Sequence, residues 1–138
     1  MDNVIVLMLA GVLIVGLSLL VLISLGKKGR SAIDKNAYQQ EWLRIESSIA
    51  QDSASQQFAV LQADKLLDKA LKELGYKGQT MGERMVSAAR AFSHRDHIWA
   101  AHKLRNRIAH EDSVSISSKV THQAMASFKR ALRDLGAL

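Results

Sequence analysis

The chain has 138 residues, no cysteine, no proline and a formal net charge of +6. The lack of cysteine excludes disulfide bonds, thiol catalysis and cysteine-based zinc sites, and the lack of proline removes the strongest breaker of α-helices. The mild positive charge permits an anionic partner without requiring one, because charges of this size are common on small domains for solubility alone.

An apolar segment without any charged residue occupies positions 4–25. As a helix it would extend about 33 Å, which is enough to cross the roughly 30 Å hydrocarbon core of a bilayer. A cleaved signal peptide is disfavoured because Asp2 and Asn3, rather than basic residues, precede the segment. We therefore expect one transmembrane helix at residues 4–25, in contact with membrane lipid.

A basic cluster follows the apolar segment, with Lys27, Lys28 and Arg30 in a short linker at residues 26–34. Basic residues that flank a membrane helix are retained in the cytoplasm. The cluster therefore predicts a single-pass protein of the inner (cytoplasmic) membrane. Residues 1–3 would lie outside the cytoplasm, and a folded domain at residues 35–138 would lie inside it.

Helical periodicity dominates the chain beyond the linker. A first helix is expected near residues 35–50, from the apolar spacing of Tyr38, Trp42, Ile45 and Ile49. A second helix ends at Gly75, a residue typical of the position just after a helix. The apolar face of this second helix consists of Val60, Ala63, Leu67, Ala70, Leu71 and Leu74.

Capping residues mark the next two helices. Thr80 and Glu83 have capping-box spacing, which predicts the start of a third helix. The apolar stripe of that helix is Met81, Met85, Ala88 and Phe92. A fourth helix is expected at residues 96–110, with Ser93 or Asp96 as its N-cap.

A serine-rich turn precedes the last helix, which ends near Gly136. Its apolar residues are Val120, Ala124, Phe128, Leu132 and Leu135. No strand-like alternation occurs in the sequence. We expect an all-α fold, in which the single transmembrane helix is followed by a small antiparallel bundle of four to five helices.

The fourth helix has two faces when its residues are placed at 100° intervals. The face expected to point to the core carries Ala101, Leu104 and Ile108. The opposite face carries Trp99, His102, Asn106 and His110. A tryptophan away from the core needs cover, so we expect this face to meet another helix, a second copy of the chain or a ligand.

Arg105-Asn106 followed by His110 matches the R-x(4–6)-H signature of the HEPN superfamily, including its polar residue after the arginine. The chain resembles HEPN domains over residues 35–136, because the motif lies late in an all-helical pattern and before a final helix. The resemblance implies a metal-independent endoribonuclease that needs no cofactor, with a role in stress or defence. It also implies a homodimer, in which the helix from Trp99 to His110 of two copies forms one composite RNA site.

The resemblance assigns roles along the motif. His110 would be the general acid and base for attack of a ribose 2′-oxygen on the adjacent phosphate, a task that suits imidazole near neutral pH. Arg105 would stabilise charge on the phosphoryl oxygens, and Asn106 would orient the phosphate or the histidine. Trp99 and His102, on the same helix face, are candidates for substrate binding or for the dimer interface.

Several observations favour other interpretations. Arg105 and His110 could be structural, because both residue types bind the carbonyls and dipole at a helix C-terminus. Glu111 and Asp112 would repel RNA phosphate, which favours a non-catalytic membrane-tethered module for interaction or RNA binding. Asp112 also stands where toxin-type members often carry a tyrosine, so regulation by tyrosine modification is not implied. No metal site is expected, because the histidines near position 96 lack a recognised ligand spacing.

Overall fold

The computed structural model describes residues 2–26, 33–111 and 114–138, which contain six α-helices and no β-strand. The predicted all-α class is thereby confirmed. The chain separates into two compact units, Met1–Ser31 and Ala32–Leu138. Lys27, Lys28 and Arg30 of the expected basic linker lie outside the described residues, as does Asp112.

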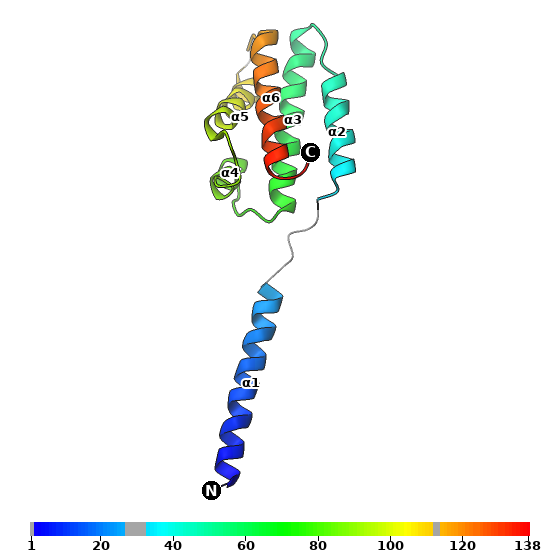
Figure 1. Ribbon diagram of the computed structural model, residues 1–138. Coiled ribbons are helices and arrows are strands. Elements are labelled where there is room, and N and C mark those ends of the chain that lie inside the picture. The colour runs from blue at the N-terminus through cyan, green and yellow to red at the C-terminus, as the bar shows by residue number, and fades with distance from the viewer. Residues whose placement is uncertain (1, 27–32, 112–113) are drawn as a thin grey trace. The chain divides into compact units, whose positions relative to one another are not determined.

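Helix α1 (Asp2–Gly26) makes up the first unit (Figure 1). At 25 residues it measures about 37 Å along its axis. From Val4 to Val21 every side chain is exposed, and the Ser18 hydroxyl donates to the Val15 carbonyl oxygen at 2.9 Å. Such a helix satisfies its own polar groups, as a lipid environment demands, and it is long and apolar enough to span a membrane.

The second unit is a bundle of five helices, namely α2 (Lys35–Ser47), α3 (Ser53–Glu73), α4 (Met81–Ser87), α5 (Arg95–His110) and α6 (Ser118–Asp134). Helix α3 is central, because it contacts each of the other four, and α5 and α6 also pack on each other. Figure 1 shows α2, α3 and α6 side by side, with α4 and α5 on the other flank of α6 and α3. The short α4 and the oblique α5 therefore border α3 from one side.

One hydrophobic core receives side chains from all five helices of the bundle. Its largest fully buried members include Tyr38, Leu66, Leu67, Leu71, Met85, Ile98, Phe128 and Leu132. The predicted apolar stripes thus face inward, with one exception in α6. Val120 is 38% exposed, and the neighbouring Thr121 is buried in its place. Thr121 lies inward because its hydroxyl donates to Oε1 of Gln56 on α3 at 3.3 Å.

Local capping explains where the helices begin and end. The side chains of Asp34, Asp52, Thr80 and Ser117 each accept a hydrogen bond from the backbone N–H three residues later, which satisfies a free donor of the first turn. Helices α3 and α6 both end in a Schellman motif at Gly75 and Gly136, whose φ angles are 76° and 74°. In each motif the glycine N–H and the next N–H bond back to the last helical turn.

Three helix boundaries differ from the sequence-based expectation. Helix α2 ends at Ser47 rather than near residue 50, because the hydroxyls of Ser47 and Ser48 bind carbonyls of the last turn and compete with helix continuation. Helix α4 stops at Ser87, before the predicted end at Phe92, since the chain turns at residues 88–91. The Phe92 ring is nevertheless buried in the core.

The predicted N-cap of α5 is also wrong. His94 occupies the cap position and makes no side-chain capping bond. Ser93 lies one residue before the cap position, and its hydroxyl accepts from Nε of Arg130 at 3.2 Å and donates to Oδ2 of Asp134 at 2.7 Å. Asp96 lies inside the first turn, where its carboxylate interacts favourably with the positive end of the helix dipole.

Candidate functional site

Helices α3, α4 and α5 border an open cleft of about 1010 Å³. Its charged and polar wall includes Asp64, Lys65, Asp68, Arg84, His102, Arg105 and Asn106. Three of the five residues predicted for the site, His102, Arg105 and Asn106, therefore meet here. Trp99 and His110 are not among the residues that line the cleft.

Four side chains in the cleft form a closed polar ring. Oδ1 of Asp64 lies 2.7 Å from Nδ1 of His102, and Nε2 of His102 lies 3.4 Å from Nδ2 of Asn106. Oδ1 of Asn106 accepts a hydrogen bond from Nη1 of Arg105 at 3.0 Å. Nε of Arg105 returns to Oδ2 of Asp64 at 3.2 Å, which closes the ring.

Asp64 is the member of this ring that sequence reasoning missed. It lies on α3 and is only 3% exposed, among the apolar residues that form the buried face of the helix. A buried carboxylate is unfavourable unless it is paired. A single aspartate on the otherwise apolar stripe of Val60, Ala63 and Leu67 was therefore the available signal that a partner faces it.

Arg105 is held by charge more than by aligned hydrogen bonds. Its Nε atom is buried and close to Asp64, but the geometry of the pair does not align the N–H with the carboxylate. The guanidinium side chain keeps 35% of its surface exposed. Arg105 can therefore present donors to an anion in the cleft, although Asp64 already balances part of its charge.

Arg84 completes the cleft on the side of α4 and is only 6% exposed. Its Nε and Nη2 atoms each lie 2.7 Å from Oδ1 of Asp68, and Nη1 donates to the carbonyls of Gly78 and Gln79. Burial raises the pKa of Asp68, but the hydrogen bonds and charges of Arg84 and Lys72 lower the pKa by more, so its net shift is downward. With its donors engaged in this way, Arg84 connects the loop before α4 to α3.

Trp99 is covered within the bundle. Its ring meets the ring of His102 edge-on, with centroids 6.0 Å apart, and it packs beside Gly82 of α4, where an added Cβ would lie 3.6 Å from Cη2 of the indole. Of the three kinds of cover expected for this face, another helix of the bundle is the one present. His102 on the same face is buried as well.

His110 lies apart from the ring, as the exposed last residue of α5. Within the described part of the chain, its side chain makes no hydrogen bond or ion pair. It lies five positions after Arg105, which places the two side chains about 140° apart around the helix. One copy of α5 therefore cannot direct both side chains at the same phosphate from a single face. The neighbouring Glu111 forms a loose pair with Arg107 at 3.4 Å.

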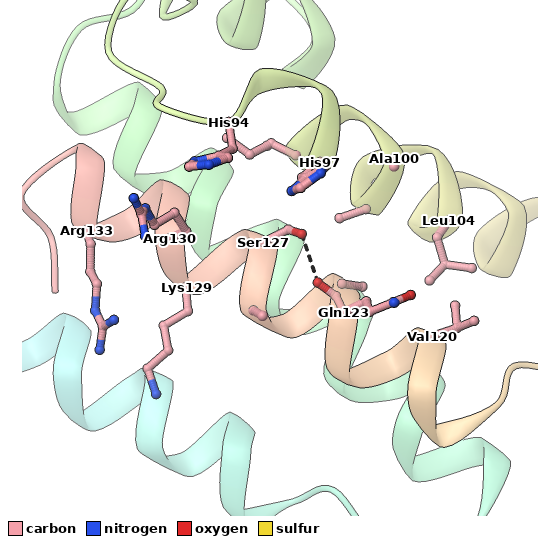
Figure 2. A pocket seen from close by; sticks show the side chains of 14 residues that line it. His94, His97, Ala100, Leu104, Val120, Gln123, Ser127, Lys129, Arg130 and Arg133 are labelled. Atoms are coloured by element: carbon pink, nitrogen blue, oxygen red, sulfur yellow. Dashed lines mark hydrogen bonds between the residues drawn. The ribbon is translucent and has the colours of Figure 1, made fainter.

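A second groove of about 690 Å³ lies between α5 and α6 (Figure 2). Leu104 and Val120 face each other at its apolar end, while His94 and Arg130 lie near each other at the opposite end. Small side chains also line the groove, among them Ala100, Ala101, Ala124 and Ser127. It contains no residue of the Arg105 motif.

Contacts at the polar end of this groove are structural. The rings of His94 and His97 stack with centroids 5.7 Å apart. The Ser93 hydroxyl accepts from Nε of Arg130 at 3.2 Å and donates to Asp134, so the start of α5 is tied to the end of α6. Among the described residues, no group of three or more His, Asp or Glu side chains could hold a metal ion.

Comparisons of the chain with protein-family models, with curated proteins and with solved structures gave no match.

Proposed function

We propose that the bundle is a membrane-tethered HEPN-like domain that cleaves RNA without a metal ion, through a site completed by a second copy of the chain. Arg105 and Asn106 would bind the phosphate, and His110 would transfer the proton. The proposal rests on the resemblance of the motif together with one observation. The buried Asp64 pairs with Arg105, which in turn donates to Asn106, at the wall of an open cleft of about 1010 Å³.

The wide separation of Arg105 and His110 around α5 supports the dimeric form of this proposal. A second copy could bring its own His110 to the phosphate held by Arg105, because the two residues do not share a face in one copy. His110 is exposed and free of partners among the described residues, as a group that must accept and return a proton needs to be. The helix from Trp99 to His110 would then contribute to the dimer interface through its exposed C-terminal end.

Membrane tethering is supported by the length and apolar composition of α1. The positive flank at Lys27, Lys28 and Arg30 favours a cytoplasmic bundle with the N-terminus outside. Restriction to the plane of the membrane would raise the frequency of encounter between two copies. Cytoplasmic RNA would be the substrate in this orientation.

A second candidate function is a non-catalytic interaction module. It is favoured by the pairing of Arg105 with Asp64, which leaves the guanidinium less free to bind phosphate. In this case the ring in the cleft would serve stability alone. The module would still self-associate or bind another membrane protein.

RNA cleavage by the full-length protein distinguishes the two functions. The protein is purified in detergent and incubated with single-stranded RNA in the presence of a chelator. We expect cleavage products ending in a 2′,3′-cyclic phosphate, and a loss of at least about 100-fold in rate in both Arg105→Ala and His110→Ala. Arg107→Ala and His97→Ala are matched controls, because both residues are exposed on the same helix.

Equal loss in the control variants would contradict the assigned roles. No cleavage by the wild type, with all variants folded, would exclude the enzyme and favour the interaction module. Chemical cross-linking of the same samples tests the dimer. An active protein that remains monomeric at every concentration would contradict the composite site.

A further inference from the structure

The polar ring in the cleft fixes the orientation of the Asn106 amide. A guanidinium group has only donors and no acceptor. The Asn106 atom 3.0 Å from Nη1 of Arg105 must therefore be the oxygen. The amide nitrogen, with its two hydrogens, consequently faces Nε2 of His102 at 3.4 Å.

The same four-residue polar ring also determines which nitrogen of the His102 imidazole carries the hydrogen. Nε2 faces a donor, so it must accept, and it carries no hydrogen. Nδ1 then carries the hydrogen and donates to Oδ1 of Asp64 at 2.7 Å. This tautomer leaves the imidazole neutral, so the polar ring as a whole contains one carboxylate and one guanidinium and has no net charge. An extra charge would be unfavourable in a buried site.

We propose that Asp64 and His102 are positioning residues for the Arg105–Asn106 pair, acting through a His102 held as the Nδ1–H tautomer. Asp64 attracts Arg105 on one side and orients His102 on the other. His102 in turn accepts from Asn106, so that the amide oxygen remains directed at Arg105. The role of this arrangement in catalysis rests on the proposed function, whereas the tautomer of His102 and the contacts of Asp64 do not depend on it.

The proposal divides the work between two histidines of α5. His102 is 9% exposed, and its two imidazole nitrogens contact Asp64 and Asn106. His110 is exposed and has no partner in the described chain. Proton transfer therefore falls to His110, while His102 serves as a fixed hydrogen-bond bridge between Asp64 and Asn106.

Nitrogen NMR of the histidine rings tests the tautomer directly. The full-length protein in detergent micelles is labelled with ¹⁵N at its histidines, and His102→Gln identifies the signals of residue 102. We expect at neutral pH a hydrogen on Nδ1 of His102 that exchanges slowly with water, and a bare Nε2. A hydrogen on Nε2, or on both nitrogens, would overturn the proposal.

Asp64→Asn tests the role of the carboxylate. Asp64 presents one oxygen to His102 and the other to Arg105, whereas an asparagine would place an amide NH2 at one of these two positions and would carry no charge. We expect the slow-exchanging Nδ1 hydrogen to be lost in this variant. Asp68→Asn is the matched control, because it makes the same change one turn further along α3, where the partner is Arg84. An unchanged His102 signal in Asp64→Asn, or the same loss in Asp68→Asn, would contradict the role of Asp64.

Cleavage kinetics test the positioning role in the enzyme. We expect Asp64→Asn to lower kcat by about 10- to 100-fold, the size typical of lost outer partners of functional groups. The pH at which the rate is greatest should stay the same, because His110 rather than His102 transfers the proton. A displaced pH profile would show that His102 takes part in proton transfer and would overturn the division of roles.

The two proposals can fail separately. A wild-type protein that does not cleave RNA refutes the proposed function, while the NMR result still decides the tautomer of His102. A protein that cleaves RNA with a different His102 tautomer retains its proposed function and refutes the positioning inference. Because the wild-type tautomer needs no variant, poor folding of Asp64→Asn cannot leave the inference undecided.

Discussion

Removal of the buried Arg84 side chain should destabilise the bundle strongly. Arg84 contacts Asp68 through two nitrogens at 2.7 Å, and it donates to the Gly78 and Gln79 carbonyls at 2.7 and 3.1 Å. In Arg84→Ala all of these contacts are lost at once. The loop before α4 then loses its main polar connection to α3.

The size of the effect follows from what remains in the variant. Loss of one partner of a buried ion pair costs about 3–5 kcal/mol. Asp68 keeps Lys72 at 2.7 Å, and water can reach the two exposed loop residues whose carbonyls are freed. We therefore expect the free energy of unfolding to fall by about 2–4 kcal/mol. For a domain of this size the Tm should fall by about 10–20 °C.

Tryptophan fluorescence can report this loss in the full-length protein. Trp42 and Trp99 are the two tryptophans of the chain, and both belong to the bundle. Their emission during urea unfolding in detergent therefore follows the bundle without a signal from α1. Arg90→Ala is the control, because Arg90 is exposed just beyond α4, and its effect should stay within about 0.5 kcal/mol.

Acid should reduce the difference between wild type and Arg84→Ala. The pKa of Asp68 is lowered in the folded state, because the contacts with Arg84 and Lys72 outweigh the raising effect of burial. A carboxyl of lowered pKa stabilises the fold above its unfolded pKa of about 3.9 and loses this contribution as pH falls through the folded pKa. A loss below about 1 kcal/mol at pH 7, or a difference undiminished in acid, would refute the assignment of Asp68 as the main partner of Arg84.

Two further variants test other contacts of the bundle. Gly82→Ala should raise the free energy of unfolding by about 0.4–1 kcal/mol, because alanine restricts the unfolded chain and the added methyl group meets Trp99 at ordinary contact distance. A lower free energy of unfolding in urea would show that the indole packs more tightly against residue 82 than this distance indicates. Burial raises the pKa of Tyr38 well above its usual range, and its hydrogen bond to Glu73 at 2.9 Å and the charge of Glu73 raise the pKa further. A raised pKa gives stability that is present below the unfolded value of about 10 and is lost above it, so wild type should lose more stability than Tyr38→Phe between about pH 9 and pH 11. Equal alkaline losses in the two proteins would contradict this.

The helices were predictable because their signals are local. Apolar residues at helical spacing indicate a buried stripe wherever the partner helix comes from, which is why Tyr38, Trp42 and Met85 were placed correctly in the core. Thr80 and Gly75 mark helix ends through bonds to their own neighbours. The errors arose where local signals compete, as at Ser47 and Ser48, whose hydroxyls end α2 early.

The candidate site was only partly predictable. The sequence by itself determined the apolar helix α1 and the all-α class, and it singled out Arg105, Asn106 and His110 as candidate site residues. A helical wheel separates a core face from the opposite face, but it assumes that only one side of the helix is buried. Helix α5 packs against α6 and against α3, and its Trp99 side chain lies beside Gly82 of α4. Trp99 and His102, which were expected to face away from the core, are therefore covered, whereas His110 at the end of the same face is exposed.

Only the tertiary structure decided which partners the motif has. Asp64 and His102 are separated by 38 positions in the chain and meet because α3 and α5 pack together. No local spacing encodes that contact, since it depends on the relative position of two helices joined through a third. The physical reason is that a buried carboxylate is unfavourable without partners. The sequence shows only an isolated Asp64 on an apolar helix face. The fold supplies the partners by placing His102 and Arg105 against it.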